Sequence, residues 1–409
     1  MNTVAVIGGG ASGMMAAITA AEDRDNRVIL FERQQRVGRK LLATGNGRCN
    51  LTNTGASGEN YHGESPEFAL SALESFTPAD TLAFFHSLGL LTAEEYGGRV
   101  YPLSNSANSV VDVLRFALES AGVELRAACP VRELRRERSG GYTVVFDGGS
   151  LFADKLIVCC GGAAGAKLGG VMDGYELLKP LGHKRTRLLP SLVQLVTAPE
   201  YPRALKGVRA QVHLTLSSTG VTLCESRGEL QFTENGVSGP AAFDVSRAAA
   251  ETGDGARLEI DFLDGYTQRE AEEILAHRVR RFPELPCGEL LTGVLHNRLG
   301  KMLIKYCALD ASRPLSSLGA AELSRVAAAC RGFELMVKGT EGFESAQVTH
   351  GGIKTSGFDP ETLESWFMPG LFVCGELLDI DADCGGYNLQ WAWSSGRLAG
   401  RLGKRSGEE

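Results

Sequence analysis

The sequence predicts an α/β chain in which a doubly wound, Rossmann-type domain is built from both ends and a β-rich insert lies between them. Two observations predict the domain. A short apolar strand leads directly into a glycine-rich turn at residues 8–13, and a buried-type strand of similar character returns at 371–374. A third observation predicts the insert, because residues 208–216 alternate between apolar and polar with a period of two.

Length and composition narrow the class of protein. The chain has 409 residues, too many for one ordinary core, so we expect two or three folding units. The net charge is −7 and no basic block occurs, which argues against a nucleic-acid partner. We find no apolar run near the ~18 residues that cross a bilayer and no signal-type segment at the N-terminus. A cytoplasmic protein without a membrane partner is therefore expected, and the oligomeric state stays open.

The numbers and positions of glycine and cysteine predict ligand contact by the backbone and the state of the thiols. The 51 glycines exceed the average share and cluster at the ends of apolar runs, which indicates backbone that approaches a ligand. The ten cysteines show no C-x-x-C spacing, so we expect reduced, buried thiols. A redox-active disulfide, for instance at the neighbouring Cys159 and Cys160, is the alternative.

The first part of the chain reads as strand, turn and helix. Residues 3–7 form a β-branched strand, residues 14–21 are rich in Ala and Met as in a helix, and a second strand is expected at 27–32. The following elements are expected as helices at 66–88 and 106–121, strands of a hairpin or meander at 123–131 and 142–147, and a buried strand at 156–160.

The character of the chain changes near Pro190. Strands at 208–216 and 257–263 predict a β sandwich or barrel. From 267 to about 331 the period becomes helical, and one helix face is marked by Leu291, Val294, Leu295, Leu299, Met302, Leu303 and Tyr306. Strands return at 333–337, 346–349 and 371–374, and the end of the chain, Lys404–Glu409, is expected to fray.

The turn at residues 8–13 has a G-x-G-x-x-G spacing after a strand and before a helix. Gly8 permits the tight turn, Gly10 lets a pyrophosphate approach the backbone, and Gly13 lets helix and strand pack closely. The helix N-terminus then presents free N–H groups to the phosphates. Glu32 ends the second strand, where a carboxylate accepts hydrogen bonds from ribose hydroxyls. These features predict a dinucleotide site, with a glycine-rich turn that binds no ligand as the alternative.

Further segments favour FAD among the dinucleotides. In residues 38–50 the glycines expose backbone amides, and Arg39, Lys40 and Arg48 supply positive charge along an extended ligand. The strand that ends at 161–162 carries small residues that let the chain pass close to the adenosine. The alternatives are a solvated basic loop and a simple turn.

The C-terminal part supplies the last of these segments. Glu376 follows directly on a strand, where an acid can hold ribityl hydroxyls, and a helix is expected to begin after Gly386. The free N–H groups and dipole of that helix would stabilise negative charge on the flavin. Three nearby acids could bind a metal instead, but carboxylates on a loop without His are a poor set for a transition metal. No metal is therefore expected at Asp379, Asp381 and Asp383.

Two long motifs carry a family resemblance. Residues 38–53 (GRKLLATGNGRCNLTN) and 385–396 (GGYNLQWAWSSG) resemble the YhiN/BaiN-type NAD(P)/FAD-dependent oxidoreductases, also called aminoacetone-oxidase-family FAD-binding enzymes. The resemblance covers essentially the whole chain. It implies a glutathione-reductase-like, Rossmann-type FAD-binding domain split in sequence, with an inserted β-barrel-like domain carrying a helical subdomain. It also implies a redox role, which in some members is reduction of an activated C=C bond.

The domain boundaries and the FAD site follow from these motifs and the resemblance. The FAD-binding domain is expected at 1–190 and 346–409, the β-rich insert at 191–265 and 332–345, and the helical subdomain at 266–331. The residues expected to bind FAD are Gly8, Gly10, Ala11, Ser12, Gly13, Glu32, Arg33, Arg39, Lys40, Leu41, Gly45, Asn46, Gly47, Arg48, Cys49, Asn50, Val131, Gly161, Gly162, Gly375, Glu376, Gly386, Tyr387, Asn388 and Leu389.

The catalytic candidates are His350, Tyr387 and Glu234. A protonated His or a Tyr hydroxyl could donate a proton to the carbon opposite the hydride site, and a packing or structural role is the alternative for both. Glu234 marks a departure from the family, whose insert motif usually reads Phe-Thr-His-x-Gly-x-Ser-Gly-Pro. At residues 232–240 this chain has Glu at the His position, which puts any role of that His in doubt here.

These features predict an FAD-dependent oxidoreductase that reduces an activated C=C bond in a small molecule. No second G-x-G-x-x-G follows a strand, so NAD(P)H is expected as a transient electron donor without a domain of its own. Two alternatives stay open. One is a flavin oxidase of a small amine such as aminoacetone, and the other is an RNA-associated protein that uses FAD structurally or for RNA modification.

Overall fold

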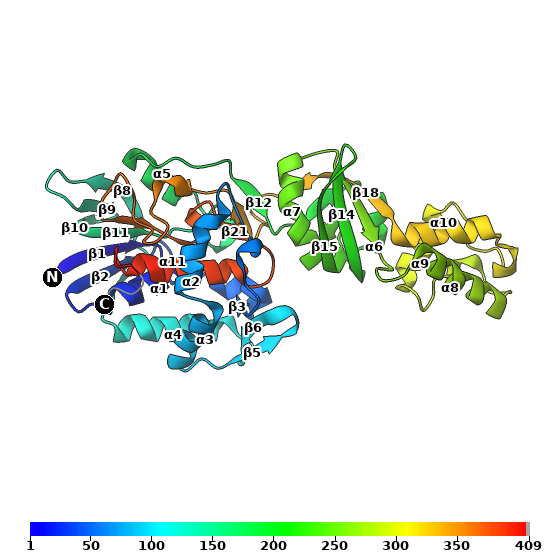
Figure 1. The fold of residues 1–409 in the computed structure, drawn as a ribbon, viewed down its shortest axis with the longest axis horizontal. Coiled ribbons are helices and arrows are strands. Elements are labelled where there is room, and N and C mark those ends of the chain that lie inside the picture. Colours follow the sequence, from blue (N-terminus) through cyan, green and yellow to red (C-terminus); the bar gives the residue numbers. More distant parts are fainter. Residues whose placement is uncertain (406–409) are drawn as a thin grey trace. The chain divides into compact units, whose positions relative to one another are not determined.

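The computed structural model describes residues 1–405 and divides the chain into two units (Figure 1). The first unit contains residues 1–189 and the segment from 347 onward, and the second contains residues 190–346. Each unit buries a hydrophobic core of its own. Fraying is expected for Lys404–Glu409, and residues 406–409 of this segment lie outside the described residues.

A five-stranded parallel sheet forms the centre of the first unit. Its strand order is β20 (Leu371–Val373), β11 (Lys155–Val158), β1 (Asn2–Ile7), β2 (Asn26–Phe31) and β7 (Glu124–Arg126). The C-terminal strand β20 pairs in parallel with β11, so the sheet is built from both ends of the chain, as predicted. The strands expected at 3–7, 27–32, 156–160 and 371–374 are confirmed.

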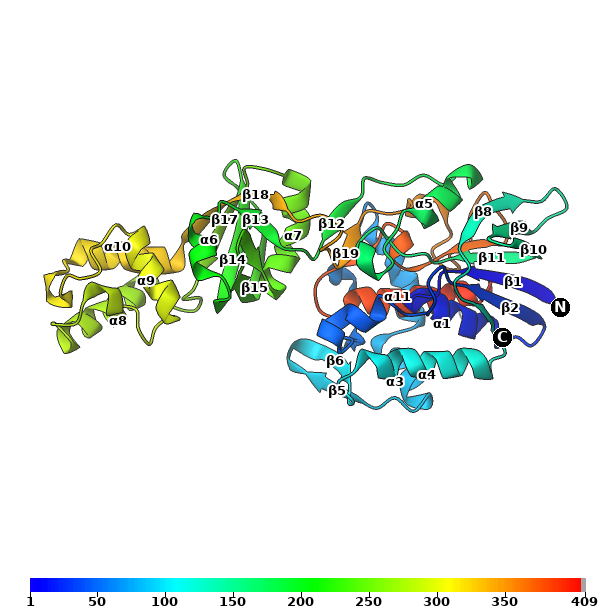
Figure 2. The same cartoon turned by 180° about the vertical axis from the view of Figure 1, so that it is seen from behind.

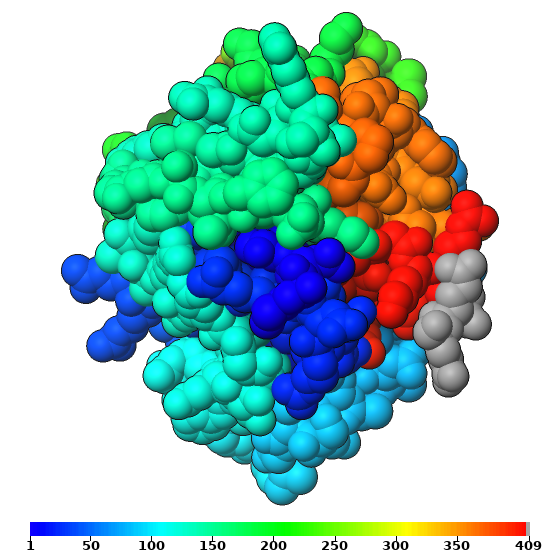
Figure 3. Space-filling view, turned by 90° about the vertical axis from the view of Figure 1, so that its left-hand side faces the viewer, coloured from blue at the N-terminus to red at the C-terminus, as the bar shows by residue number. Residues whose placement is uncertain are grey.

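Two helices from opposite ends of the sequence pack against each other beside this sheet. Helix α1 (Ala11–Ala20) lies along α11 (Tyr387–Gly400) on one side, and α4 (Ala107–Ser120) lies next to α1 (Figures 1 and 2). Small side chains allow the close approach, because a Cβ on Gly396 would collide with the backbone of Ser12. Atoms from the two ends of the chain, blue and red, also adjoin on the surface (Figure 3). At the start of β11, the Lys155 ammonium donates to the carbonyl of Leu402 at 2.8 Å.

The remaining elements of the first unit surround this centre. The three-stranded antiparallel sheet of β10, β9 and β8 lies on the other side of the parallel sheet from α1 (Figure 1). The elements are β3 (Thr52–Asn53), β4 (Tyr61–His62), β5 (Thr92–Glu95), β6 (Arg99–Pro102), β8 (Val131–Arg136), β9 (Tyr142–Phe146), β10 (Gly149–Ala153), β19 (Val348–His350), β21 (Asp381–Ala382), α2 (Leu70–Ser75), α3 (Pro78–Ser87) and α5 (Asp173–Leu178). Strand β12 (Leu189–Ser191) stands at the boundary of the two units.

The second unit is a closed six-stranded barrel with a helical region. The strand order is β13 (Leu195–Thr197), β16 (Gly236–Ser238), β15 (Val221–Phe232), β14 (Arg209–Ser218), β17 (Arg257–Asp261) and β18 (Phe333–Thr340). The period of two is confirmed, since Val212, Leu214 and Leu216 are buried in the barrel core. The helices are α6 (Glu200–Leu205), α7 (Pro240–Thr252), α8 (Gln268–Arg281), α9 (Asn297–Tyr306) and α10 (Ala320–Arg331).

Two helix expectations are wrong in their extent. The helix expected at 66–88 is interrupted before α3, because Thr77 caps α3 by accepting from the Asp80 N–H and Pro78 occupies its first turn. The helix expected from Leu291 begins only at Asn297. Of the preceding apolar residues, Leu291 is buried and Leu295 partly buried around a turn in which Gly293 has a φ of +83°, and so they imitate a helical spacing.

Of the hairpin or meander expected from strands at 123–131 and 142–147, the antiparallel meander is found as β8, β9 and β10, but the first strand is wrong in its extent. Residues 124–126 form β7, which joins the parallel sheet beside β2. Ala128 has a φ of 52° and Pro130 follows it, so the chain turns before β8 begins at Val131. Strand β9 pairs with β8 on one side and β10 on the other.

Candidate active site

The glycine-rich turn between β1 and α1 combines two different constraints. Gly8 has a φ of +111°, and a Cβ on Gly8 or Gly13 would collide with backbone of the protein itself. Gly10 caps α1 at a φ of −80°, and a Cβ there would meet no atom within 4 Å. The protein therefore needs the first and third glycines for its own packing. The middle glycine borders open space at a helix N-terminus, which fits a phosphate group.

Glu32 holds this turn from the end of β2. One oxygen of its carboxylate accepts a hydrogen bond from the Gly9 N–H at 2.8 Å, and the other accepts from the Gln34 N–H at 2.7 Å. Burial raises the pKa of Glu32, and these backbone bonds oppose that rise. The buried carboxylate thus shapes the loop around Gly10, and its bond to a ribose stays a prediction.

The segment from 38 to 50 exposes backbone amides as a run of unusual conformations. Gly45, Asn46, Gly47 and Cys49 have φ values of 57°, 56°, 84° and 63°. The guanidinium of Arg48 lies 4.0 Å from the centre of the Tyr101 ring and pairs with Glu95 and Asn105. Arg48 therefore fastens this segment to the small sheet of β5 and β6.

Three predicted cofactor residues from distant parts of the sequence lie together. The Lys40 ammonium lies 2.6 Å from one carboxylate oxygen of Glu376, and the Thr349 N–H donates to the other at 2.9 Å. A Cβ on Gly162 would collide with the Thr349 hydroxyl and lie 2.9 Å from the Glu376 carboxylate. The structure thus joins the basic loop, the end of β11 and the end of β20 at one place.

An orphaned polar atom of the 38–50 segment lies beside the N-terminus of α11. Gly386 caps this helix with a φ of +104°, as the sequence predicted for a helix start. The side-chain oxygen of Asn50 is buried, lies 3.0 Å from the position of a Gly386 Cβ, and has no hydrogen-bond partner. A buried amide oxygen without a donor is costly. A polar ligand group beside α11 would satisfy it, so the residues present fit FAD.

The side chains around the start of α11 fix its geometry. The Asn388 amide donates to the Ala382 carbonyl at 2.8 Å and accepts from the Ala382 N–H at 2.9 Å. The Tyr61 hydroxyl donates to the carbonyl of Tyr387 at 3.2 Å. This cap holds the loop before α11 against β4.

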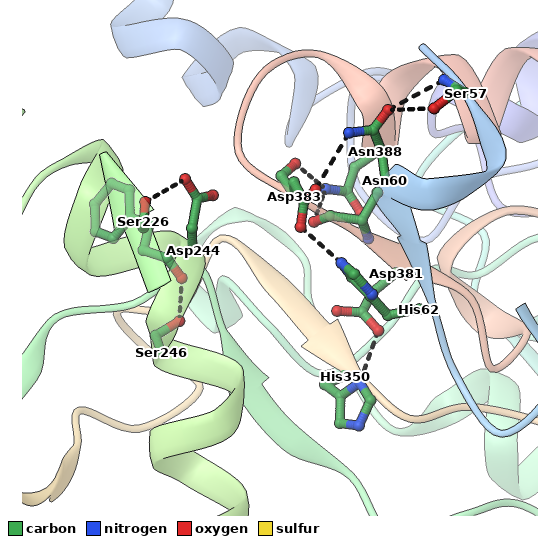
Figure 4. A network of polar contacts seen from close by, with 12 residues as sticks. Ser57, Asn60, His62, Ser226, Asp244, Ser246, His350, Asp381, Asp383 and Asn388 are labelled. Atoms are coloured by element: carbon green, nitrogen blue, oxygen red, sulfur yellow. Dashed lines mark hydrogen bonds and ion pairs between the residues drawn. The ribbon is translucent and has the colours of Figure 1, made fainter. Parts of the chain in front are cut away.

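Two His–Asp pairs lie at the short strand β21 and the residue that follows it (Figure 4). His350 Nδ1 lies 2.7 Å from one oxygen of Asp381, and His62 Nε2 lies 2.6 Å from one oxygen of Asp383. The Asp381 side chain is 1% exposed and that of Asp383 is 33% exposed. Sequence reasoning missed His62, because the pairing of β4 with β21 brings together residues more than 300 positions apart.

The three loop acids considered as metal ligands make separate contacts. Asp379 accepts from the Glu64 N–H at 3.2 Å, whereas the other two pair with histidines. Within residues 1–405 no group of three or more His, Cys, Asp or Glu side chains is arranged to hold a metal ion.

The catalytic candidates fall in different units. His350 and Tyr387 belong to the first unit, and Glu234 belongs to the second. The Glu234 carboxylate is exposed and lies 2.9 Å from the Lys206 ammonium, which lowers the pKa of Glu234. The catalytic role of each residue stays a prediction.

The other predicted cofactor residues divide between core and surface. Leu41 and Val131 are buried, Ser12 packs against Gly375, and Arg33 forms an exposed ion pair of 2.9 Å with Asp173. Arg39 is exposed and donates to Gln34, and the remaining positions are Ala11, Gly161 and Leu389 in or beside the elements already described.

None of the ten cysteines, all of which lie within residues 1–405, forms a disulfide in the structure. Cys49 and Cys160 adjoin the predicted cofactor segments, and burial raises the pKa of each thiol to about 12. A protonated thiol is a poor nucleophile, so the structure favours packing over redox chemistry for both.

No helix among residues 1–405 is long and apolar enough to span a membrane.

Comparison with known proteins gives full-length matches. Residues 2–402 match the family described as HI0933-like protein Rossmann domain. The chain is 39% identical over 405 residues to a 3-dehydro-bile acid Δ4,6-reductase of Clostridium scindens, covering 98% of both chains. It is 29% identical over 393 residues to a ribosomal RNA dihydrouridine synthase of Escherichia coli, covering 95% of both.

The fold is also found among solved structures. A 3-ketosteroid Δ1-dehydrogenase from Sterolibacterium denitrificans matches with a TM-score of 0.51 and 14% identity. The match covers 98% of this chain and 99% of that one. At this identity the likeness concerns the fold alone.

Proposed function

The chain belongs to the HI0933-like family of Rossmann-type FAD-binding oxidoreductases, and from this membership we propose that it reduces a C=C bond conjugated to a carbonyl group in a small molecule. The observation that carries the proposal is the 39% identity to a bile acid Δ4,6-reductase along 98% of both chains.

The names of the two relatives support the reaction class independently of the substrate. A Δ4,6-reductase and a dihydrouridine synthase both add hydrogen across a C=C bond, although one acts on a bile acid and the other on ribosomal RNA. Since the more similar of these two relatives is named for a bile acid, a polycyclic enone is the substrate class that we favour for this chain.

The cofactor site follows from the geometry of the first unit. The N-terminus of α1 beside Gly10 would hold the pyrophosphate, because free N–H groups and the helix dipole favour negative charge there. The Lys40–Glu376 pair and the amide of Asn50 would hold polar groups nearer the flavin. When bound, FAD accepts a hydride from a donor and passes it to the substrate.

The residues of the protein would position the substrate and move a proton. The hydrogenation of a C=C bond needs one hydride and one proton, and His350 is the group that we propose as proton donor. NAD(P)H is the proposed hydride source, binding transiently because the chain has no second G-x-G-x-x-G after a strand.

Anaerobic kinetics test the proposal directly. The purified protein with FAD bound should be reduced by NADH or NADPH, and the reduced protein should be reoxidised by a 3-oxo-Δ4 steroid with loss of the enone absorbance. Each mole of enone reduced should consume one mole of NAD(P)H. Reduction of the protein by aminoacetone, followed by reoxidation by O₂ alone with O₂ converted to hydrogen peroxide, would instead support the oxidase alternative.

Ribosomal RNA is the second substrate to test, because the relative from Escherichia coli acts on it. Dihydrouridine in treated RNA can be measured by mass spectrometry. Its formation without any enone reduction would replace the small-molecule proposal by RNA modification.

A further inference from the structure

We propose that Asp381 is a positioning residue that fixes the protonation of His350 for proton donation, an inference that rests on the proposed reduction of a C=C bond. The two residues come from β21 and β19, short strands separated by about thirty positions in the sequence. Asp381 is held by its backbone, because β21 pairs with β4 in a fixed antiparallel register.

The contact between the two side chains specifies which ring nitrogen carries a proton. Asp381 Oδ1 lies 2.7 Å from His350 Nδ1, and an ionised carboxylate only accepts hydrogen bonds. Nδ1 must therefore be the donor. In this tautomer the proton that the ring gains and loses is the one on Nε2, as in a histidine that acts as acid or base against an aspartate.

The burial of Asp381 indicates that the ring is favoured in its charged form. The Asp381 side chain is 1% exposed, and its second oxygen, Oδ2, is buried without a hydrogen-bond partner. A buried, half-satisfied carboxylate is costly unless a positive charge lies next to it. His350 is the side chain in contact that can supply that charge.

Other acids reinforce this effect around the same ring. Burial raises the pKa of Asp379, the nearby His350 lowers it, and Glu64 and Asp381 raise it further. Lys354 pairs with Glu64 at 2.8 Å and so neutralises one of these acids. Asp381 and Asp379 thus both place a carboxyl group near His350, and a carboxylate there favours an imidazolium.

The reaction balances with His350 in this role. One carbon of the double bond receives the hydride, the π bond breaks, and its electron pair takes a proton at the neighbouring carbon. That proton leaves Nε2 of the imidazolium. The ring becomes neutral, with Nδ1–H still bonded to Asp381, and a proton from solvent restores the charged form.

The second His–Asp pair, His62 of β4 and Asp383 just after β21, provides a matched control. His62 Nε2 lies 2.6 Å from Asp383 Oδ1, so His62 should carry its proton on Nε2, the opposite tautomer. The side chains of His62 and Asp383 are 21% and 33% exposed, so water weakens the electrostatic effect of the carboxylate on the ring. Removing the Asp383 charge should therefore have little effect on proton donation.

The tautomers can be measured without turnover. Nitrogen-15 NMR of the full chain with labelled histidine, assigned with His350→Gln and His62→Gln, should show protonated Nδ1 for His350 and protonated Nε2 for His62. Asp381→Asn should change the signals of His350 alone, and Asp383→Asn those of His62 alone. A wild-type His350 without a proton on Nδ1 would overturn the inference, even if the aspartate variants do not fold.

Kinetics then separate positioning from a structural role. Asp381→Asn should lower kcat by about 100-fold, with KM within about twofold and flavin content unchanged, because a general acid contributes on this scale. Asp383→Asn should stay within about threefold of wild type. Wild-type kcat in Asp381→Asn, or a loss that merely follows lost flavin, would refute the assignment. If the wild type reduces no enone, the proposed function fails while the NMR measurement still decides the role of Asp381.

Discussion

Gly10 differs from the other two glycines of its motif because the protein itself does not need it. Its φ is ordinary and a Cβ would meet nothing within 4 Å, whereas Gly8 and Gly13 are enclosed by backbone. At the scale of single residues, this contrast separates glycines that the fold requires from one that we propose to serve a ligand.

A substitution at Gly10 should therefore affect FAD and spare the fold. We expect Gly10→Val to weaken FAD binding by at least about 100-fold, or about 3 kcal/mol, while circular dichroism stays as in the wild type. Gly319→Val is the matched control, since Gly319 also caps a helix at a φ of −85° with nothing within 4 Å. Stoichiometric flavin in the Gly10 variant would place the pyrophosphate elsewhere.

Glu234 tests whether the departure from the family motif has a function. Its carboxylate is exposed and forms only a surface pair with Lys206, which water screens, so a substitution should not disturb the barrel. We expect Glu234→His and Glu234→Ala to change kcat/KM by about threefold or more at constant flavin content. Glu334→Ala, which removes an exposed pair with Arg257, is the control. Unchanged kinetics in both Glu234 variants would make this loop a structural turn.

At the scale of elements, the sequence predicts the helices and strands that are marked by a short motif in their own residues. The strand, turn and α1 follow from the glycine spacing, and the start of α11 follows from Gly386. The interruption of the helix expected at 66–88 and the late start of α9 were not predicted. Apolar residues in turns can share the spacing of a helix. The pairing of β7 with β2 was not predicted, because the tertiary fold decides which strand lies beside β7.

The same distinction, between local motifs and contacts set by the tertiary fold, explains which site residues were predicted. Gly10, Lys40 and Glu376 each belong to a motif readable along the chain, although their proximity is not. His62 has no motif, because its partner Asp383 is brought to it by the pairing of β4 with β21. Contacts made by long-range pairing of two-residue strands carry no periodic signal.

His183 links two segments of the first unit and should make its stability depend on pH. The imidazole is 4% exposed, stacks on Phe358 at 4.6 Å between ring centres, and bonds to the Ser365 hydroxyl. Burial lowers the pKa of His183 from 6.5 to about 4. Between these values the unfolded chain binds a proton that the folded protein does not, so stability falls as the pH falls from 6.5 to 4.

Urea unfolding at pH 7 and pH 4.5 measures this effect. We expect the wild type to lose about 2 kcal/mol more than His183→Gln over this range, because one pKa unit corresponds to about 1.4 kcal/mol. His86→Gln, at an exposed histidine, should keep the wild-type dependence. Equal pH dependence in wild type and His183→Gln would show that this ring is not the titrating group.

At the scale of the whole molecule, two separate cores imply two cooperative transitions. The first unit buries one apolar cluster and the second buries another, and the residues that fit FAD lie in the first. All three tryptophans, Trp366, Trp391 and Trp393, also belong to the first unit. Tryptophan fluorescence therefore reports the unfolding of the first unit, and calorimetry reports both.

Removing FAD should thus destabilise one transition and leave the other in place. A ligand at 1,000 times its Kd stabilises the state that binds it by about 4 kcal/mol, so the fluorescence transition should fall by several degrees in the apoprotein. Leu214→Ala should do the reverse. It opens a cavity in the barrel, which costs about 2–5 kcal/mol, and should lower the calorimetric transition that fluorescence does not follow, at unchanged flavin content. A single transition that shifts as a whole in both experiments would mean that the two cores unfold as one unit.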